Sequence, residues 1–167
     1  MKKMFLPLLL VITLVSCSTV QKAQPLRYQS LPMVCEADYE SDAGTGRVKI
    51  DCASTQDYTV SFLSPDIMRG VTYEYLDGKS YMCFGDSRIP TGEAPMPRGM
   101  LACARLFMLD PTKAGEPTPT DTGELIYTLS YEGVQANVTE REGAPVKIEG
   151  RVNGFTCTYT NIEITYG

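Results

Sequence analysis

The sequence contains no histidine and no tryptophan among its 167 residues. Histidine is the most common general base and the most common zinc ligand in proteins, so its absence removes the usual catalytic triads and most zinc sites. No serine lies in a Gly-x-Ser-x-Gly turn, and the six cysteines form no C-x-x-C pair. These absences predict a protein that is not an enzyme and that requires no metal or other cofactor.

Basic residues are also scarce. The chain has 15 Lys and Arg residues against 20 Asp and Glu residues, a net charge of −5, and no basic cluster. Nucleic acids and anionic membrane surfaces are recognised by clustered Lys and Arg, so neither is an expected partner. The length suits one domain that is large enough to bury a core.

The one extended apolar run lies at the N-terminus. Lys2 and Lys3 precede an uncharged stretch of 11 residues, Phe5 to Val15. A membrane-spanning helix needs ~20 apolar residues, whereas this stretch has the length of the apolar part of a secretory signal peptide. It ends in LVSC at residues 14–17, which resembles the lipobox of bacterial lipoproteins, where the cysteine receives a diacylglyceryl group. We therefore expect Cys17 to be the lipid attachment site.

This assignment divides the chain into three parts. Residues 1–16 are expected to be a cleaved signal peptide, residues 17–30 a flexible tether, and residues 31–167 the folded domain. Two acyl chains suffice for stable membrane attachment. The membrane is thus an expected partner, and the expected location is the extracytoplasmic face of the cell membrane, or the outer membrane where the organism has one.

Most of the mature chain alternates apolar and polar residues with a period of two, which predicts strands. Two hairpins have a predicted register. Asp77-Gly78 suits a type I′ turn that pairs residues 71–76 with 79–84. Asn153-Gly154 similarly pairs residues 148–152 with 155–159. Further strands are predicted at 58–63, 125–131, 134–139 and 160–165.

A third hairpin is predicted around the sequence Asp42-Ala43-Gly44-Thr45. A two-residue loop at Ala43-Gly44 pairs residue 42 with 45, and the same register places Cys35 opposite Cys52. The two cysteines are therefore a candidate disulfide. The alternative is a pair of reduced core thiols in a poorly oxidising envelope.

One segment, residues 98–109, has the pattern of an amphipathic helix. Apolar side chains recur at helical spacing on one side, and Arg98 and Arg105 share the other side. We predict a mainly β (α+β) fold, in which eight or nine strands form a curved antiparallel sheet. This sheet is an incomplete barrel with the helix packed on its concave face.

The stretch FLSPDIMRGVTYEYLDGKSYMCFGD resembles the core of the LolA/LolB-like lipoprotein carrier superfamily. The shared features are a strand that ends at Pro65, the turn Asp77-Gly78-Lys79, and an aromatic-rich strand after it. The family's next element, a helix led by a proline, matches 97–109. The resemblance extends from Cys35 to the C-terminus and includes small surface lipoproteins without an assigned role. The carriers have a basic residue where this chain has Ser64, so the resemblance implies the fold rather than the transfer activity.

The predicted fold creates an apolar cup. Its expected lining is Tyr58, Val60, Phe62, Val71, Tyr73, Met82 and Phe84 from the strands, facing Met100, Cys103 and Phe107 from the helix. Two interpretations follow from this cup. Either it leaves space for an acyl chain or a lipoprotein ligand, or the helix fills it as an ordinary core.

The first interpretation predicts a membrane-anchored, non-enzymatic lipoprotein with a ligand-binding half-barrel. The second predicts a module with a closed, dry core that binds another envelope protein through its outer surface or its proline-rich loops.

Overall fold

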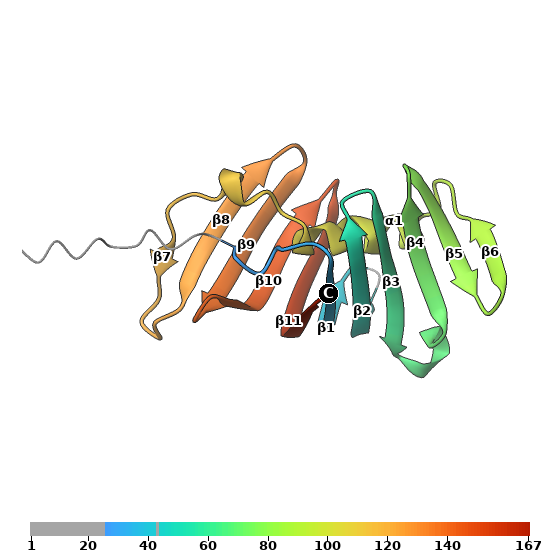
Figure 1. Ribbon diagram of the computed structural model, residues 1–167, viewed down its shortest axis with the longest axis horizontal. Coiled ribbons are helices and arrows are strands. Elements are labelled where there is room, and N and C mark those ends of the chain that lie inside the picture. Colours follow the sequence, from blue (N-terminus) through green and yellow to red (C-terminus); the bar gives the residue numbers. More distant parts are fainter. Residues whose placement is uncertain (1–25, 43) are drawn as a thin grey trace, which may run out of the picture.

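The computed structural model describes residues 26–42 and 44–167, so the expected signal peptide and Cys17 lie outside the described residues. The described chain forms an 11-stranded antiparallel sheet (Figure 1) with the order β6-β5-β4-β3-β2-β1-β11-β10-β9-β8-β7. The strands are β1 (Met33–Ser41), β2 (Gly44–Ser54), β3 (Asp57–Ser64), β4 (Val71–Leu76), β5 (Lys79–Phe84), β6 (Ser87–Pro90), β7 (Thr118–Pro119), β8 (Leu125–Tyr131), β9 (Val134–Arg141), β10 (Ala144–Val152) and β11 (Phe155–Tyr166).

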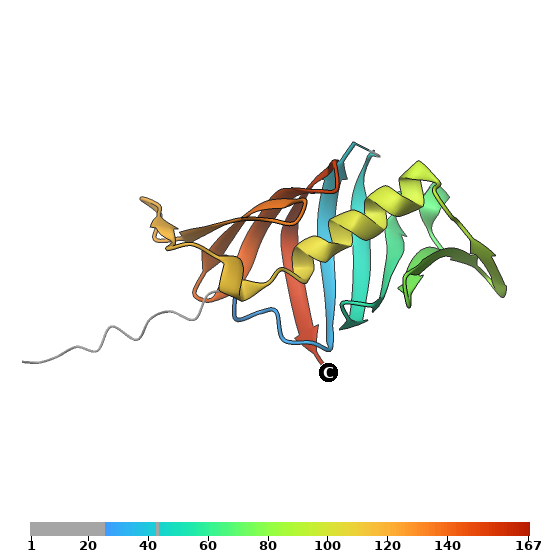
Figure 2. The same ribbon diagram turned by 90° about the horizontal axis from the view of Figure 1, so that it is seen from above.

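The α-helix of the described chain, α1 (Pro95–Ala104), lies across one face of the sheet, which curves around it (Figure 2). It starts with proline in its first turn, where a missing N–H costs nothing, and it continues into a 3₁₀ turn, η2 (Arg105–Phe107). The remaining turns are η1 (Asp66–Met68) and η3 (Pro111–Lys113). The predicted fold class, a curved sheet with one helix on its concave face, is confirmed.

The two hairpins with Asx-Gly turns have the predicted registers. Asp77 and Asn153 both adopt positive φ angles, 49° and 52°, and a glycine with positive φ follows each. Residues 71–76 pair with 79–84, and 148–152 pair with 155–159. Each register places the apolar side chains of both strands on the same face of the sheet, because the side-chain period of a strand is two.

The register predicted for the first hairpin is wrong. Ser41 pairs with Gly44, so the loop lies one residue earlier than expected, and Cys35 pairs with Ile50 while Cys52 pairs with Met33. The two cysteines are free thiols, offset by two residues along their strands. The register argument for a disulfide between them therefore fails.

The N- and C-terminal halves of the sheet meet where β1 pairs with β11. The expected tether enters this region: Leu26 and Tyr28 are buried in the core, and the Tyr166 hydroxyl donates a hydrogen bond of 3.0 Å to the Tyr28 carbonyl. These residues of the segment 17–30 thus belong to the folded domain. No helix within the described part of the chain is long and apolar enough to cross a membrane.

Candidate functional site

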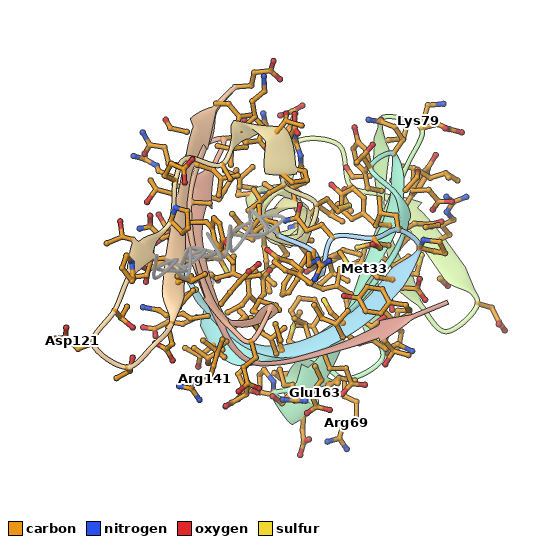
Figure 3. All side chains as sticks on the ribbon, turned by 60° about the vertical axis from the view of Figure 1, so that its left-hand side comes forward. Met33, Arg69, Lys79, Asp121, Arg141 and Glu163 are labelled. Atoms are coloured by element: carbon orange, nitrogen blue, oxygen red, sulfur yellow. The ribbon has the colours of Figure 1, made fainter. Side chains whose placement is uncertain are left out.

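Most side chains of the predicted cup lie in the closed hydrophobic core. Tyr58, Val60, Phe62, Tyr73, Met100, Cys103 and Phe107 are all buried. Figure 3 shows side chains filling the space between the curved sheet and the helix. The interior thus has the form of an ordinary core, which was the second of the two interpretations.

Aromatic contacts account for much of this packing. The Phe62 ring lies 6.1 Å from the Tyr39 ring and 5.3 Å from the Tyr73 ring, both in edge-to-face geometry. The Phe107 ring lies 4.7 Å from Tyr159. Such contacts add about 0.5–1.5 kcal/mol per pair beyond the burial of apolar area.

The other three predicted cup residues lie at the β4–β6 end of the sheet. Val71 and Met82 are half-buried, and Phe84 is 62% exposed. Ile89 on β6 pairs with Met82 and is 51% exposed. We call Val71, Met82, Phe84 and Ile89 the apolar shelf. It extends the concave face beyond the region that the helix covers.

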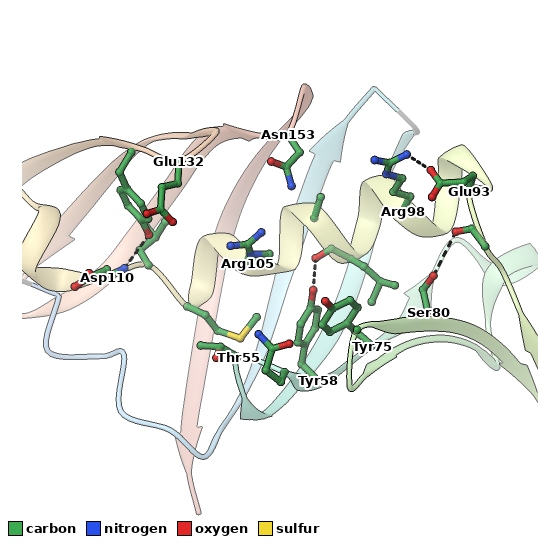
Figure 4. A pocket seen from close by; sticks show the side chains of 18 residues that line it. Thr55, Tyr58, Tyr75, Ser80, Glu93, Arg98, Arg105, Asp110, Glu132 and Asn153 are labelled. Atoms are coloured by element: carbon green, nitrogen blue, oxygen red, sulfur yellow. Dashed lines mark hydrogen bonds and ion pairs between the residues drawn. The ribbon is translucent and has the colours of Figure 1, made fainter.

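A cleft of about 660 Å³ crosses the outer side of α1 (Figure 4). This volume lies within the range of ligand sites, roughly 300–1,000 Å³. The helix forms the floor, and turns from distant parts of the sheet form the two walls. The lining residues include Tyr58, Tyr75, Glu93, Arg98, Leu101, Ala102, Arg105, Met108, Asp110, Tyr131, Glu132 and Asn153.

One wall of the cleft is aromatic. The Tyr58 and Tyr75 rings stack with their centroids 5.1 Å apart and their planes 28° apart. The Tyr58 hydroxyl donates a hydrogen bond of 3.1 Å to the Leu101 carbonyl, which fixes the wall to the helix. Tyr58, Leu101 and Ala102 are buried beneath the surface of the cleft. The half-buried side chains of Tyr75 and Met108 are therefore the apolar groups that the cleft exposes.

The charges in the cleft differ in whether they are paired. Arg98 forms an ion pair with Glu93 at one end. Asp110 accepts two hydrogen bonds from Thr112, which lower the pKa of its carboxyl and keep it ionised. Arg105 lies between the two walls (Figure 4), exposed, and has no hydrogen-bond or ion-pair partner for its side chain among the described residues.

The charge of Arg105 reaches the aromatic wall. Burial raises the pKa of the Tyr58 hydroxyl, and the nearby guanidinium acts in the opposite direction. A guanidinium that the protein does not neutralise is a docking point for a carboxylate or phosphate, which it binds in a bidentate manner. The cleft thus combines two half-buried apolar side chains, Tyr75 and Met108, with a cation that no described residue neutralises.

The cysteine thiols of β1 and β2 do not have the environment of nucleophiles. Burial raises the pKa of Cys52 to about 12, and it raises that of Cys35 further. A thiol is nucleophilic only as the thiolate, so these two side chains are unreactive core groups.

No protein-family model matches the chain, and no curated protein matches it. Several solved structures are similar in fold, among them the following two. A conserved protein from Thermus thermophilus has a TM-score of 0.42 and 8% identity, and the match covers 82% of each chain. A LolA superfamily protein from Nitrosomonas europaea has a TM-score of 0.40 and 10% identity, with 81% of this chain and 84% of that chain covered. Likeness at this level concerns the fold only.

The sequence pattern did not predict the cleft. Its walls come from the β2–β3 and β4–β5 turns on one side and the β8–β9 and β10–β11 turns on the other. The sequence did indicate the floor of the cleft, because Arg98 and Arg105 are seven residues apart and therefore lie on one side of the helix. That side is the floor of the cleft.

Proposed function

We propose that the chain is a membrane-anchored, non-enzymatic lipoprotein that binds an acyl chain carrying an acidic group. The ligand is a lipid or the acylated end of a lipoprotein partner. Its site is the cleft on the outer side of α1, and not the space between helix and sheet. The observation that carries this proposal is that the cleft brings the half-buried apolar side chains of Tyr75 and Met108 together with Arg105, whose charge no described residue pairs.

The apolar side of the cleft suits a flexible chain. Tyr75 is half-buried and presents a flat apolar ring, which the buried Tyr58 supports by stacking against it. Met108 lies further along the floor, and an unbranched thioether side chain adapts to ligands of varied shape. Each methylene that leaves water contributes about 0.8 kcal/mol.

The charged side chains fix the orientation. Glu93 lies at one end of the cleft, and Asp110 and Glu132 lie toward the other end (Figure 4). These carboxylates repel an acidic headgroup, so the headgroup is placed beside Arg105 in the middle. Arg105 attracts an acidic headgroup only at short range within the cleft. The net negative charge of the whole chain is therefore compatible with an acidic ligand at this site.

The test is native mass spectrometry of the full chain, purified in mild detergent and exposed to palmitate or lysophosphatidylglycerol. We expect a retained adduct of the probe's mass. Arg105→Glu should weaken binding by about tenfold or more, since a charge-assisted contact contributes roughly 1.5–3 kcal/mol. Arg69→Glu is the control, because Arg69 is exposed and lies at the opposite end of the β4–β5 hairpin.

The same spectra test the anchor. The intact mass should correspond to a chain that begins at Cys17 and carries acyl groups. A mass that includes residues 1–16 would contradict the lipoprotein assignment. Absence of any probe adduct, or equal binding by Arg105→Glu, would contradict the acyl-binding site.

A second candidate function is supported by the apolar shelf. Phe84 on β5 and Ile89 on the edge strand β6 are exposed, and exposed apolar patches often mark protein contacts. In this case the chain is an interaction module for another envelope protein, with a closed core. This alternative predicts that the native mass spectra show the protein without a bound probe. It also predicts that variants of the cleft, such as Arg105→Glu, have no effect on the function.

A further inference from the structure

The helix crosses the concave face obliquely, from β3–β5 to β10 and β11 (Figure 2). On the helix side, Gly99, Cys103 and Phe107 recur every fourth residue, and on β11 the side chains of Phe155, Cys157 and Tyr159 share the face toward the helix. These two series lie against each other.

Contacts fix both ends of this alignment. A Cβ placed on Gly99 would lie 2.9 Å from Cδ1 of Phe155, so the helix backbone is close to β11 there. At the other end the rings of Phe107 and Tyr159 are 4.7 Å apart. The middle positions of the two series are Cys103 and Cys157.

The two thiols are neighbours in the core. Both side chains are buried, and they lie between the Gly99–Phe155 and Phe107–Tyr159 contacts. Their interaction raises the pKa of Cys103 and lowers that of Cys157. The close approach depends on small residues on both sides: a Cβ on Gly150, the β10 partner of Cys157, would lie 2.8 Å from Cδ2 of Leu106.

The remaining described cysteines are arranged differently. Cys35 and Cys52 are offset by two residues on neighbouring strands. Cys83 donates a hydrogen bond of 3.6 Å to the carboxylate of Glu74. A disulfide requires Cβ atoms roughly 3.5–4.5 Å apart, and Cys103 and Cys157 are the described pair that two packed elements hold between fixed contacts on both sides.

We propose that Cys103 and Cys157 are a redox pair that closes to a disulfide, tying α1 to the central strand of the sheet. In this reaction the thiolate of Cys157 attacks a disulfide oxidant and releases one of its thiols. Cys103 then loses its proton and displaces the second thiol. The two cysteines lose two protons and two electrons, and the oxidant disulfide becomes two thiols. Because both sulfurs are buried, closure takes place as the helix docks during folding.

The test refolds the full chain with oxidised or with reduced glutathione and then alkylates the remaining thiols in denaturant. After oxidation we expect two fewer alkylated thiols and a peptide pair linked through Cys103 and Cys157. The oxidised protein should also unfold at a higher urea concentration than the reduced protein. Cys83→Ser is the matched control and should keep both effects, while Cys103→Ser should lose both.

The peptide map of the unmodified chain decides the question even if Cys103→Ser fails to fold. Complete alkylation after oxidation, or a linked pair that joins Cys35 to Cys52, would overturn the proposal. The readout is a covalent bond that forms without any ligand, so its result is separate from that of the acyl-binding test.

Discussion

At the scale of single residues, the most unusual side chain is Glu140 on β9. It is 4% exposed, and one of its carboxylate oxygens has no hydrogen-bond partner among the described residues. The backbone N–H of Leu26 donates to the carboxylate, but burial dominates and raises the pKa of Glu140 above the ordinary 4.5. Glu140 thus joins the N-terminal segment to the sheet and destabilises the fold when it is ionised.

This shift predicts a pH dependence with a definite sign. Above pH 4.5 the folded state binds the Glu140 proton more tightly than the unfolded state, so the free energy of unfolding decreases as the pH rises. Glu140→Gln removes this decrease. Urea unfolding at a series of pH values should show the variant gaining stability relative to the wild type as the pH rises from 4.5, until Glu140 is ionised in the folded state.

Glu149 provides a control of opposite sign. The hydrogen bond from Lys147 lowers the pKa of Glu149, so its contribution to stability is present above the ordinary value of 4.5 and is lost as the pH falls. Glu149→Gln should therefore lose stability relative to the wild type as the pH rises. If the free energy of unfolding changed with pH in the same way for the wild type and Glu140→Gln, this result would contradict the role of Glu140.

At the scale of elements, the decisive one is the helix with its 3₁₀ extension, which closes the concave face. Phe107 in η2 is fully buried against Tyr159, whereas Phe84 on β5 is 62% exposed. Both were predicted to line the same cup. Their different environments show that the cup is closed in the middle of the sheet and open at the β4–β6 end.

This contrast predicts different costs for the same substitution. Phe107→Ala should lower the free energy of unfolding by about 3–5 kcal/mol, since it leaves a cavity in a packed core. Phe84→Ala should lower it by less than about 1 kcal/mol, because the ring is mostly in water. Urea unfolding of the two variants measures both values. Similar small losses would mean that η2 does not plug the sheet.

The elements also show how far the sequence could predict the fold. The hairpins at Asp77-Gly78 and Asn153-Gly154 were predictable in register, because each turn has only one place for its two positive φ angles. The segment 42–45 admits two adjacent two-residue loops, and the observed one shifts the partner of Cys35 from 52 to 50. Local sequence does not decide between them.

The alternation of apolar and polar residues could not predict contacts between segments that are far apart in the sequence. The contact of Cys103 with Cys157, and the pairing of β1 with β11, join segments that are far apart in the chain. The cleft is assembled from four turns and a helix, so only its floor, with Arg98 and Arg105 on one side, had a visible signal.

At the scale of the whole molecule, the sheet and helix divide the concave side into three regions. The middle is a closed core, the β4–β6 end is the apolar shelf, and the outer side of the helix is the floor of the cleft. A half-barrel with a filled interior can still bind an acyl chain if the site lies over the helix instead of beneath it. This is the central claim of the proposed function.

The most direct measurement is photo-cross-linking of the full chain with a diazirine analogue of palmitate, followed by peptide mass spectrometry. We expect adducts on Tyr75 and Met108, the half-buried apolar side chains of the cleft, and competition by unlabelled palmitate. Adducts on the buried Val60 or Phe62, or on the apolar shelf at Phe84 and Ile89, would contradict the proposed site by placing the acyl chain elsewhere.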